Sequence, residues 1–142
     1  MRITRPVLME IRQQLSTAYP AEACGLLVGE RTAGNEVRVR RAVPMPNGRT
    51  VDGAARNRYV IAPDDYRSAE AEARAAGLEI VGVYHSHPDV AARPSAYDEE
   101  HAWPWFGYLI VSVARGEVVE ERAWELTDDR RFVERTLETE EH

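Results

Sequence analysis

Two histidines and an aspartate have the types and spacing that suit metal-assisted hydrolysis. His85 and His87 are two positions apart at the end of an apolar run that we predict to be a strand, so both imidazoles leave the same face. Asp98 follows beyond a loop that contains Pro88 and Pro94. Two imidazoles and one carboxylate would leave a fourth position open, as in catalytic zinc sites. Zinc lowers the pKa of water in that position to about 7, which makes hydroxide available at neutral pH.

The same residues also have structural explanations. A pair of strand histidines is more often a satisfied core or surface pair than a metal site. Ser95-x-x-Asp98, which precedes two glutamates, is typical of a capping box that opens a helix. A helix that begins there would place Asp98 in its first turn, directed back toward the strand end that carries the histidines. The capping interpretation is therefore compatible with a metal site.

The elements that must position these residues follow from the spacing of apolar side chains. Residues 7–15 are apolar at helical intervals and predict an amphipathic helix that ends before Tyr19-Pro20. Residues 24–29 and 37–41 predict two paired strands. A second helix is expected over residues 63–77, because proline and two aspartates suit its first turn and a glycine suits its end.

The second half of the chain predicts three more strands. Residues 78–84 are apolar on both faces and predict a central strand that runs into His85. Residues 108–113 predict another apolar strand, and residues 118–126 alternate as a half-exposed edge strand would. The charged tail from Thr127 is compatible with a short helix.

Composition limits the classes of protein that fit. A length of 142 residues with 44 % hydrophobic content suits one domain over residues 1–142. No stretch approaches the roughly 20 apolar residues of a membrane span, and the N-terminus lacks a signal-peptide run, so we expect a cytoplasmic protein with no membrane partner. A single cysteine, Cys24, excludes an internal disulfide or a cysteine-rich metal cluster. The net charge of −6 argues against general nucleic-acid binding.

The whole string, from His85-x-His87 through seven residues to Ser95-x-x-Asp98, resembles the signature of the JAMM/MPN family of zinc peptidases. An upstream segment, Glu22-Ala-Cys-Gly-Leu-Leu-Val-Gly29, resembles the family's glutamate segment. The resemblance covers most of the chain and shows no departure at a catalytic position. It implies an α/β fold of the JAMM/MPN (cytidine-deaminase-like) type: a single three-layer domain whose central mixed β-sheet is flanked by helices.

The resemblance also implies a role for each matched residue. His85, His87 and Asp98 would hold one Zn²⁺ per chain. Glu22 would take a proton from the water and return it to the leaving amine. Ser95 would donate a hydrogen bond to the oxyanion of the tetrahedral intermediate, which is worth about 3 kcal/mol at similar sites.

The expected substrate class follows from what the chain lacks. Only about nine residues separate Asp98 from the strand at Tyr108, so the insertions of ubiquitin-cleaving relatives have no room. The chain is similar to bacterial free-standing members that act on small ubiquitin-like (β-grasp) sulfur-carrier proteins ending in Gly-Gly. A narrow slot at the metal would admit only residues without side chains, and the loop at 44–57 or a sheet edge would pair with an extended tail. The arginines at 49, 56 and 58 would help to dock an acidic carrier.

Other interpretations stay open. The chain can be a zinc hydrolase of another amide substrate, or a non-catalytic MPN-type module that binds protein. A cysteine hydrolase built on Cys24 is disfavoured, because a lone cysteine in an apolar strand is usually a small buried hydrophobe. Trp103, Trp105 and Phe106 are expected in the core rather than in a substrate platform. The sequence does not indicate the oligomeric state.

Overall fold

The computed structural model describes residues 1–46 and 61–141. The arginines at 49, 56 and 58, most of the 44–57 loop, and His142 lie outside these residues, so the predictions made for them remain predictions. The elements, in chain order, are β1 (Arg2–Thr4), α1 (Arg5–Ala18), β2 (Cys24–Arg31), β3 (Val37–Met45), α2 (Pro63–Ala75), β4 (Glu79–Pro88), α3 (Ala96–His101), β5 (Gly107–Ala114), β6 (Glu117–Leu126), β7 (Phe132–Arg135) and β8 (Glu138–Glu140).

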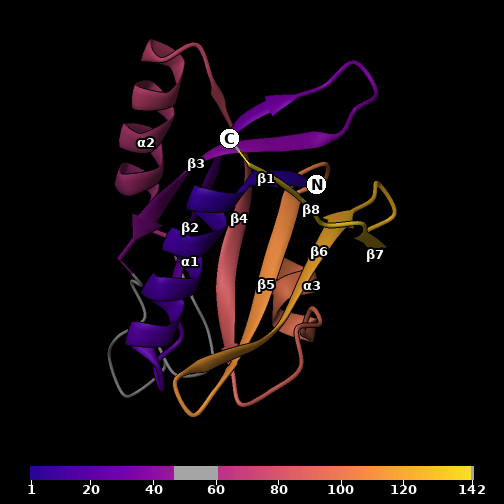
Figure 1. The fold of residues 1–142 in the computed structure, drawn as a ribbon. Coiled ribbons are helices and arrows are strands. Elements are labelled where there is room, and N and C mark those ends of the chain that lie inside the picture. The colour runs from indigo at the N-terminus through magenta and orange to yellow at the C-terminus, as the bar shows by residue number, and fades with distance from the viewer. Residues whose placement is uncertain (47–60, 142) are drawn as a thin grey trace.

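One mixed sheet runs through the described part of the chain. Its eight strands have the order β7-β6-β5-β4-β2-β3-β1-β8. Strands β4 and β5 are parallel, whereas β2 is antiparallel to both of its neighbours. The parallel pair requires a crossover, and α3 lies within it (Figure 1). The expected α/β class with a central mixed sheet and flanking helices is confirmed.

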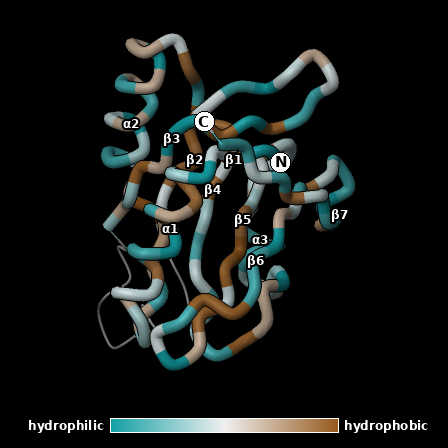
Figure 2. Tube along the Cα trace, in the orientation of Figure 1, coloured by the Kyte–Doolittle hydropathy of each residue, from teal (hydrophilic) through white to brown (hydrophobic). Residues whose placement is uncertain are grey.

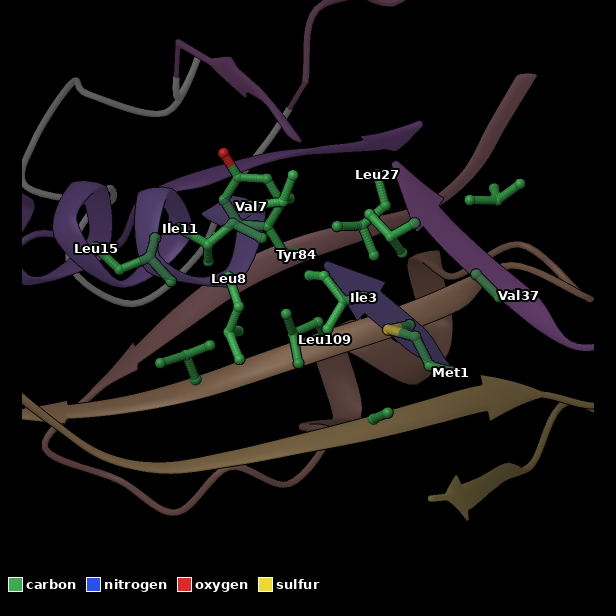
Figure 3. Close-up of a cluster of buried hydrophobic side chains, with 14 of the residues drawn as sticks. Met1, Ile3, Val7, Leu8, Ile11, Leu15, Leu27, Val37, Tyr84 and Leu109 are labelled. Carbon is green, nitrogen blue, oxygen red and sulfur yellow. The ribbon is translucent and has the colours of Figure 1, made fainter. Parts of the chain in front are cut away.

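The helices cover opposite faces of this sheet. Consecutive residues of β2 divide between two cores: Leu27 joins the cluster that contains the buried face of α1, and Leu26 joins the cluster that contains Ala69 and Ala73 of α2. Figure 3 shows side chains of α1 directed toward Tyr84 and Leu109 of the sheet. Figure 2 shows hydrophobic residues along β5 and hydrophilic residues through much of α2, as expected for a central strand and an outer helix.

The predicted helices and strands form where the local pattern indicates. Helix α1 ends before Tyr19, and its buried residues are the four that repeat at helical intervals: Val7, Leu8, Ile11 and Leu15. Helix α2 begins at Pro63 and is followed by Gly77, whose φ of 76° is a conformation that glycine adopts without a steric cost. Strand β4 is buried over most of its length and ends at Pro88.

Two predictions about the C-terminal half are wrong. Strand β6 is not at the edge of the sheet, because β7 pairs with it. The tail after Thr127 forms β7 and β8 rather than a helix. Its charges pair across strands: Arg38 and Glu140 are 3.0 Å apart, and Arg2 lies 3.6 Å from Glu138. Arg2 and Glu138 are on neighbouring strands, where opposite charges stabilise the pairing, whereas the Arg38–Glu140 pair reaches across β1. The sequence alone does not give this register.

The prediction for the aromatic residues after α3 also fails in part. Trp103 and Trp105 are 52 % and 44 % exposed, so neither is a core residue. Phe106 is half-buried and packs against the cluster on the α2 side. No helix within the described residues is long and apolar enough to cross a membrane.

Candidate metal centre

The end of β4 presents two buried imidazoles. His85 is fully buried and His87 is 7 % exposed, and their ring centroids are 5.0 Å apart. The intervening Ser86 contacts a different part of the chain, as the alternation of a strand requires.

Asp98 reaches the same place from α3. Ser95 is the N-cap of this helix: its Oγ accepts from the Asp98 amide at 3.1 Å, and Asp98 Oδ2 accepts from the Ser95 amide at 2.8 Å. The capping box is therefore present, and it turns the Asp98 carboxylate back toward β4. Asp98 is 6 % exposed, so this carboxylate is buried beside the histidines.

The three side chains converge at separations that suit one ion. Asp98 Oδ2 lies 3.2 Å from His87 Nε2, and Asp98 Oδ1 lies 3.6 Å from His85 Nε2. One ligand atom from each residue can be chosen so that all lie within 4.8 Å of one another. Nitrogen and oxygen ligands at about 2.0–2.2 Å from a tetrahedral zinc ion are roughly 3.4 Å apart. His85, His87 and Asp98 therefore form a group that can hold a metal.

The electrostatics of the group favour a cation. Burial raises the pKa of Asp98, but the attraction of His85 and hydrogen bonds from His87 and the Ser95 amide outweigh it and lower this pKa to about 2. Burial lowers the pKa of His87, but the hydrogen bonds to Asp98 and to the Ala91 carbonyl outweigh it, so this pKa is raised. Asp98 is thus ionised at neutral pH and attracts a positive charge to the space between it and the imidazoles.

Glu22 lies on the other side of His85. Its Oε1 is 3.4 Å from His85 Nδ1, and the residue is 5 % exposed. The segment that carries Glu22 is fixed to β4 by Ser86, whose Oγ accepts from the Ala23 amide at 3.0 Å. The Ser86 amide in turn donates to the Ala23 carbonyl at 3.0 Å. The structure therefore places Glu22 beside the metal group.

Two residues that hold this arrangement are not evident from the sequence. The first is Ser86, which the motif treats as a variable position. The second is Gln14 of α1, whose amide donates to the Cys24 carbonyl at 3.1 Å and whose carbonyl oxygen accepts from the Tyr84 hydroxyl. A polar residue on the buried side of an otherwise amphipathic helix is the only sequence signal for it.

Cys24 belongs to the scaffold of the site rather than to its chemistry. It is fully buried at the start of β2, and burial followed by the charge of Glu22 raises the pKa of its thiol to about 12. A thiolate is therefore absent at neutral pH, and the nucleophilic alternative is disfavoured.

An apolar pocket opens directly beside the metal group. It has a volume of about 520 Å³ and is lined by residues of α2, α3 and the sheet. Asp98 lies at its wall, with Leu26 and Val83 from the sheet and with Tyr66 and Trp103, whose rings meet edge to face at a centroid distance of 5.3 Å. The exposed Trp103 therefore contributes to this pocket.

Comparison with known proteins assigns the family. A profile described as prokaryotic homologs of the JAB domain matches residues 4–127. This chain belongs to that family. Desampylase from Haloferax volcanii is 37 % identical over 107 residues, which are 75 % of this chain and 73 % of the relative. A probable TtuB-protein conjugate cleaving protease from Thermus thermophilus is 32 % identical over 100 residues, which are 70 % of this chain and 62 % of the relative. The resemblance to JAMM-type peptidases is thus confirmed.

Solved structures of similar proteins agree with the fold. A protein from Salinibacter ruber is 42 % identical, with a TM-score of 0.76 over 99 % of this chain and 92 % of that one. A protein from Desulfitobacterium hafniense is 29 % identical, with a TM-score of 0.85 over 99 % of this chain and 93 % of that one. A JAB1/MPN domain protein from Archaeoglobus fulgidus is 22 % identical with a TM-score of 0.60 over 98 % of each chain, and this likeness bears on the fold alone.

Proposed function

We propose that residues 1–142 act as one zinc-dependent peptidase domain that hydrolyses the bond after the C-terminal Gly-Gly of a ubiquitin-like sulfur-carrier protein. The observation that carries the proposal is the convergence of His85, His87 and Asp98 beside Glu22 and beside an open pocket. The named relatives are a desampylase and a conjugate-cleaving protease, which supports a hydrolase of protein conjugates.

The metal proposed for the site is one Zn²⁺, with His85 Nε2, His87 Nε2 and a carboxylate oxygen of Asp98 as its ligands. The donor set fits zinc because it combines two imidazoles with one carboxylate. When bound, zinc supplies Lewis-acid polarisation of a carbonyl and a nucleophile at neutral pH. The buried Asp98 would supply the negative charge that retains the ion, and the Ala91 carbonyl, 2.9 Å from His87 Nδ1, orients that imidazole.

Glu22 and Ser95 are the residues that act on the water and on the substrate. The Glu22 carboxylate accepts a proton from the attacking water and then donates it to the leaving amine. Its burial and the two hydrogen bonds between Ala23 and Ser86 keep it in position for both transfers. Ser95 Oγ already accepts a hydrogen bond from the Asp98 amide, so its hydroxyl hydrogen is directed to another acceptor. The oxyanion of the substrate serves as that acceptor.

The pocket beside Asp98 accommodates the carrier tail upstream of the scissile bond. The pocket is too large and too apolar to be a slot for glycine alone. The two glycines at the scissile bond therefore lie next to the metal ligands, and a bulky residue of the carrier tail before them enters the pocket. Each residue of an extended chain advances about 3.3 Å, so a residue two or three positions before the last glycine lies about 7–10 Å from it. Glycine at the bond itself avoids a side chain among buried ligands.

The test uses a Gly-Gly carrier protein from the same organism that bears a C-terminal extension, incubated with the zinc-loaded enzyme and followed by intact mass. Cleavage directly after Gly-Gly is expected, and a carrier that ends in Gly-Ala should be cut much more slowly. Equal cleavage of the two carriers would refute the requirement for glycine at the scissile bond. No cleavage of any carrier by an enzyme that hydrolyses another amide would refute the substrate assignment and leave the zinc hydrolase alternative.

A further inference from the structure

The loop that connects β4 to α3 folds back over a row of polar residues on three neighbouring strands. His87 of β4 is the register partner of Ser112 of β5, and Ser112 is the register partner of Glu120 of β6. These three side chains therefore share the face of the sheet that carries α3. Ser112 Oγ donates to the Val90 carbonyl at 2.5 Å, which holds the loop against the middle of this row.

One peptide group of the loop connects the two ends of the row. The Ala91 carbonyl lies 2.9 Å from His87 Nδ1, and the Ala92 amide donates to Glu120 Oε1 at 2.8 Å. The carbonyl of residue 91 and the amide of residue 92 belong to the same planar peptide group, and in a trans peptide they point in opposite directions. Glu120 and His87 therefore contact opposite sides of a single peptide bond.

The direction of each hydrogen bond is determined. A carbonyl oxygen only accepts, so the bond to Ala91 requires a hydrogen on His87 Nδ1. In the protonated ring Nε2–H donates to Asp98, and in the neutral ring that keeps the Nδ1 hydrogen Nε2 has the lone pair that a metal would take. At the other end, the carboxylate accepts from the Ala92 amide. A hydrogen bond at the amide polarises the peptide group, and this makes its carbonyl a stronger acceptor for the imidazole.

Neighbouring residues of β6 fix the Glu120 carboxylate and the loop at Ala92. Arg122 is 3.0 Å from Glu120 Oε2, which leaves Oε1 for the loop. The Ala92 hydrogen bond lowers the pKa of Glu120, as does the one from Arg122, so the side chain is a carboxylate at neutral pH. Trp124 Nε1 donates to the Ala92 carbonyl at 3.1 Å, so the next peptide group is fixed as well. Ala92 itself is fully buried.

We propose that Glu120 is a positioning residue for the metal centre, acting through the Ala91–Ala92 peptide group to fix the tautomer and orientation of His87. Metal-ligating histidines commonly donate their second nitrogen to a carboxylate or a carbonyl, and removal of such a partner typically costs about 10- to 100-fold in metal affinity or activity. Here one peptide group stands between the carboxylate and the histidine. The inference rests on the proposed role of His87 as a zinc ligand.

The test compares variants at two adjacent glutamates of β6. Glu120→Ala and Glu120→Met remove the acceptor, and Met also keeps the length of the side chain; Glu120→Gln keeps an acceptor oxygen. Glu121→Met is the matched control, since Glu121 is on the opposite face of the strand and pairs with Arg12 of α1. Two quantities are measured: zinc affinity by competition with a chromophoric chelator, and the His87 tautomer in metal-free protein by long-range ¹H–¹⁵N NMR at a pH where the ring is neutral.

The expected results separate this proposal from a general loss of structure. Glu120→Ala and Glu120→Met should bind zinc about 10-fold more weakly and should lose population of the Nδ1–H tautomer, while Glu120→Gln and Glu121→Met stay close to wild type. Wild-type affinity and tautomer in Glu120→Met would overturn the proposal. An equal loss in Glu121→Met would also overturn it, because the cause would then be net charge. If wild-type protein binds no zinc, the proposed function fails, and the tautomer measurement still decides the role of Glu120.

Discussion

Replacing Ser86 by alanine should separate the placement of Glu22 from the binding of metal. Ser86 is 1 % exposed, and its Oγ accepts from the Ala23 amide at 3.0 Å. The variant keeps the backbone bond between Ser86 and Ala23 but leaves the Ala23 amide without its side-chain acceptor. Loss of a hydrogen bond to a partly buried amide costs about 1–2 kcal/mol in the free energy of unfolding. In a chain of this length, that cost lowers the melting temperature by roughly 3–7 °C.

The same substitution should lower turnover, because Glu22 is the residue that precedes Ala23. A misplacement of about 1 Å can cost 100-fold in rate, so partial release of Glu22 is expected to lower kcat by about 10-fold. Zinc content should stay at the wild-type level, since neither histidine loses a partner. The assay combines thermal unfolding, elemental analysis and carrier cleavage, with Ser68→Ala on the exposed side of α2 as the control. Wild-type melting and turnover in Ser86→Ala would refute this reasoning, and loss of zinc would show that Ser86 supports the ligands instead.

Three further predictions concern the surroundings of the centre. Cys24→Ala should keep zinc and turnover in elemental analysis and carrier cleavage, because a buried thiol with a pKa of about 12 is no nucleophile; an inactive, folded variant would contradict this. Zinc affinity, measured by chelator competition, should fall by about tenfold per pH unit below the raised pKa of His87, because the metal must displace the proton that the imidazole then carries. Asp98, with a pKa of about 2, stays ionised over this range, and a zinc affinity that does not change with pH would contradict the prediction. One guanidinium nitrogen of Arg130 donates to the carbonyls of residues 99, 100 and 102 at 2.7–3.2 Å and so fixes the end of α3. Arg130→Ala should therefore speed amide hydrogen exchange in α3 and weaken zinc binding, and an unchanged exchange rate would contradict this prediction.

Local sequence patterns were sufficient to predict the helices and strands that carry the site. The four apolar residues of α1 are the ones that are buried, and the proline and glycine signals mark the ends of α2 correctly. The convergence of His85, His87 and Asp98 was also predictable in outline. Strand alternation sets the direction of the two imidazoles, and the capping box sets the direction of the carboxylate, and both are consequences of short-range sequence spacing.

Features that depend on distant partners were not predictable from the sequence. Strand β8 pairs with β1, and its Glu138 and Glu140 meet arginines of β1 and β3 that lie more than 100 residues away along the chain. The roles of Ser86 and Glu120 depend on contacts across 63 and 28 residues, and periodicity carries no information about such pairs. Trp103 is exposed because it lines a pocket between α2 and α3, which exists only once both helices are placed on the sheet.

The most direct test of a zinc centre with Glu22 as proton carrier is the rate of carrier cleavage by Glu22→Gln, measured on samples whose zinc content is known. Both proteins should hold about one zinc per chain, because the three ligands are unchanged. Turnover of the variant should fall at least about 100-fold, since glutamine cannot accept the proton. Wild-type turnover in zinc-loaded Glu22→Gln would contradict the account, because another group would then move the proton.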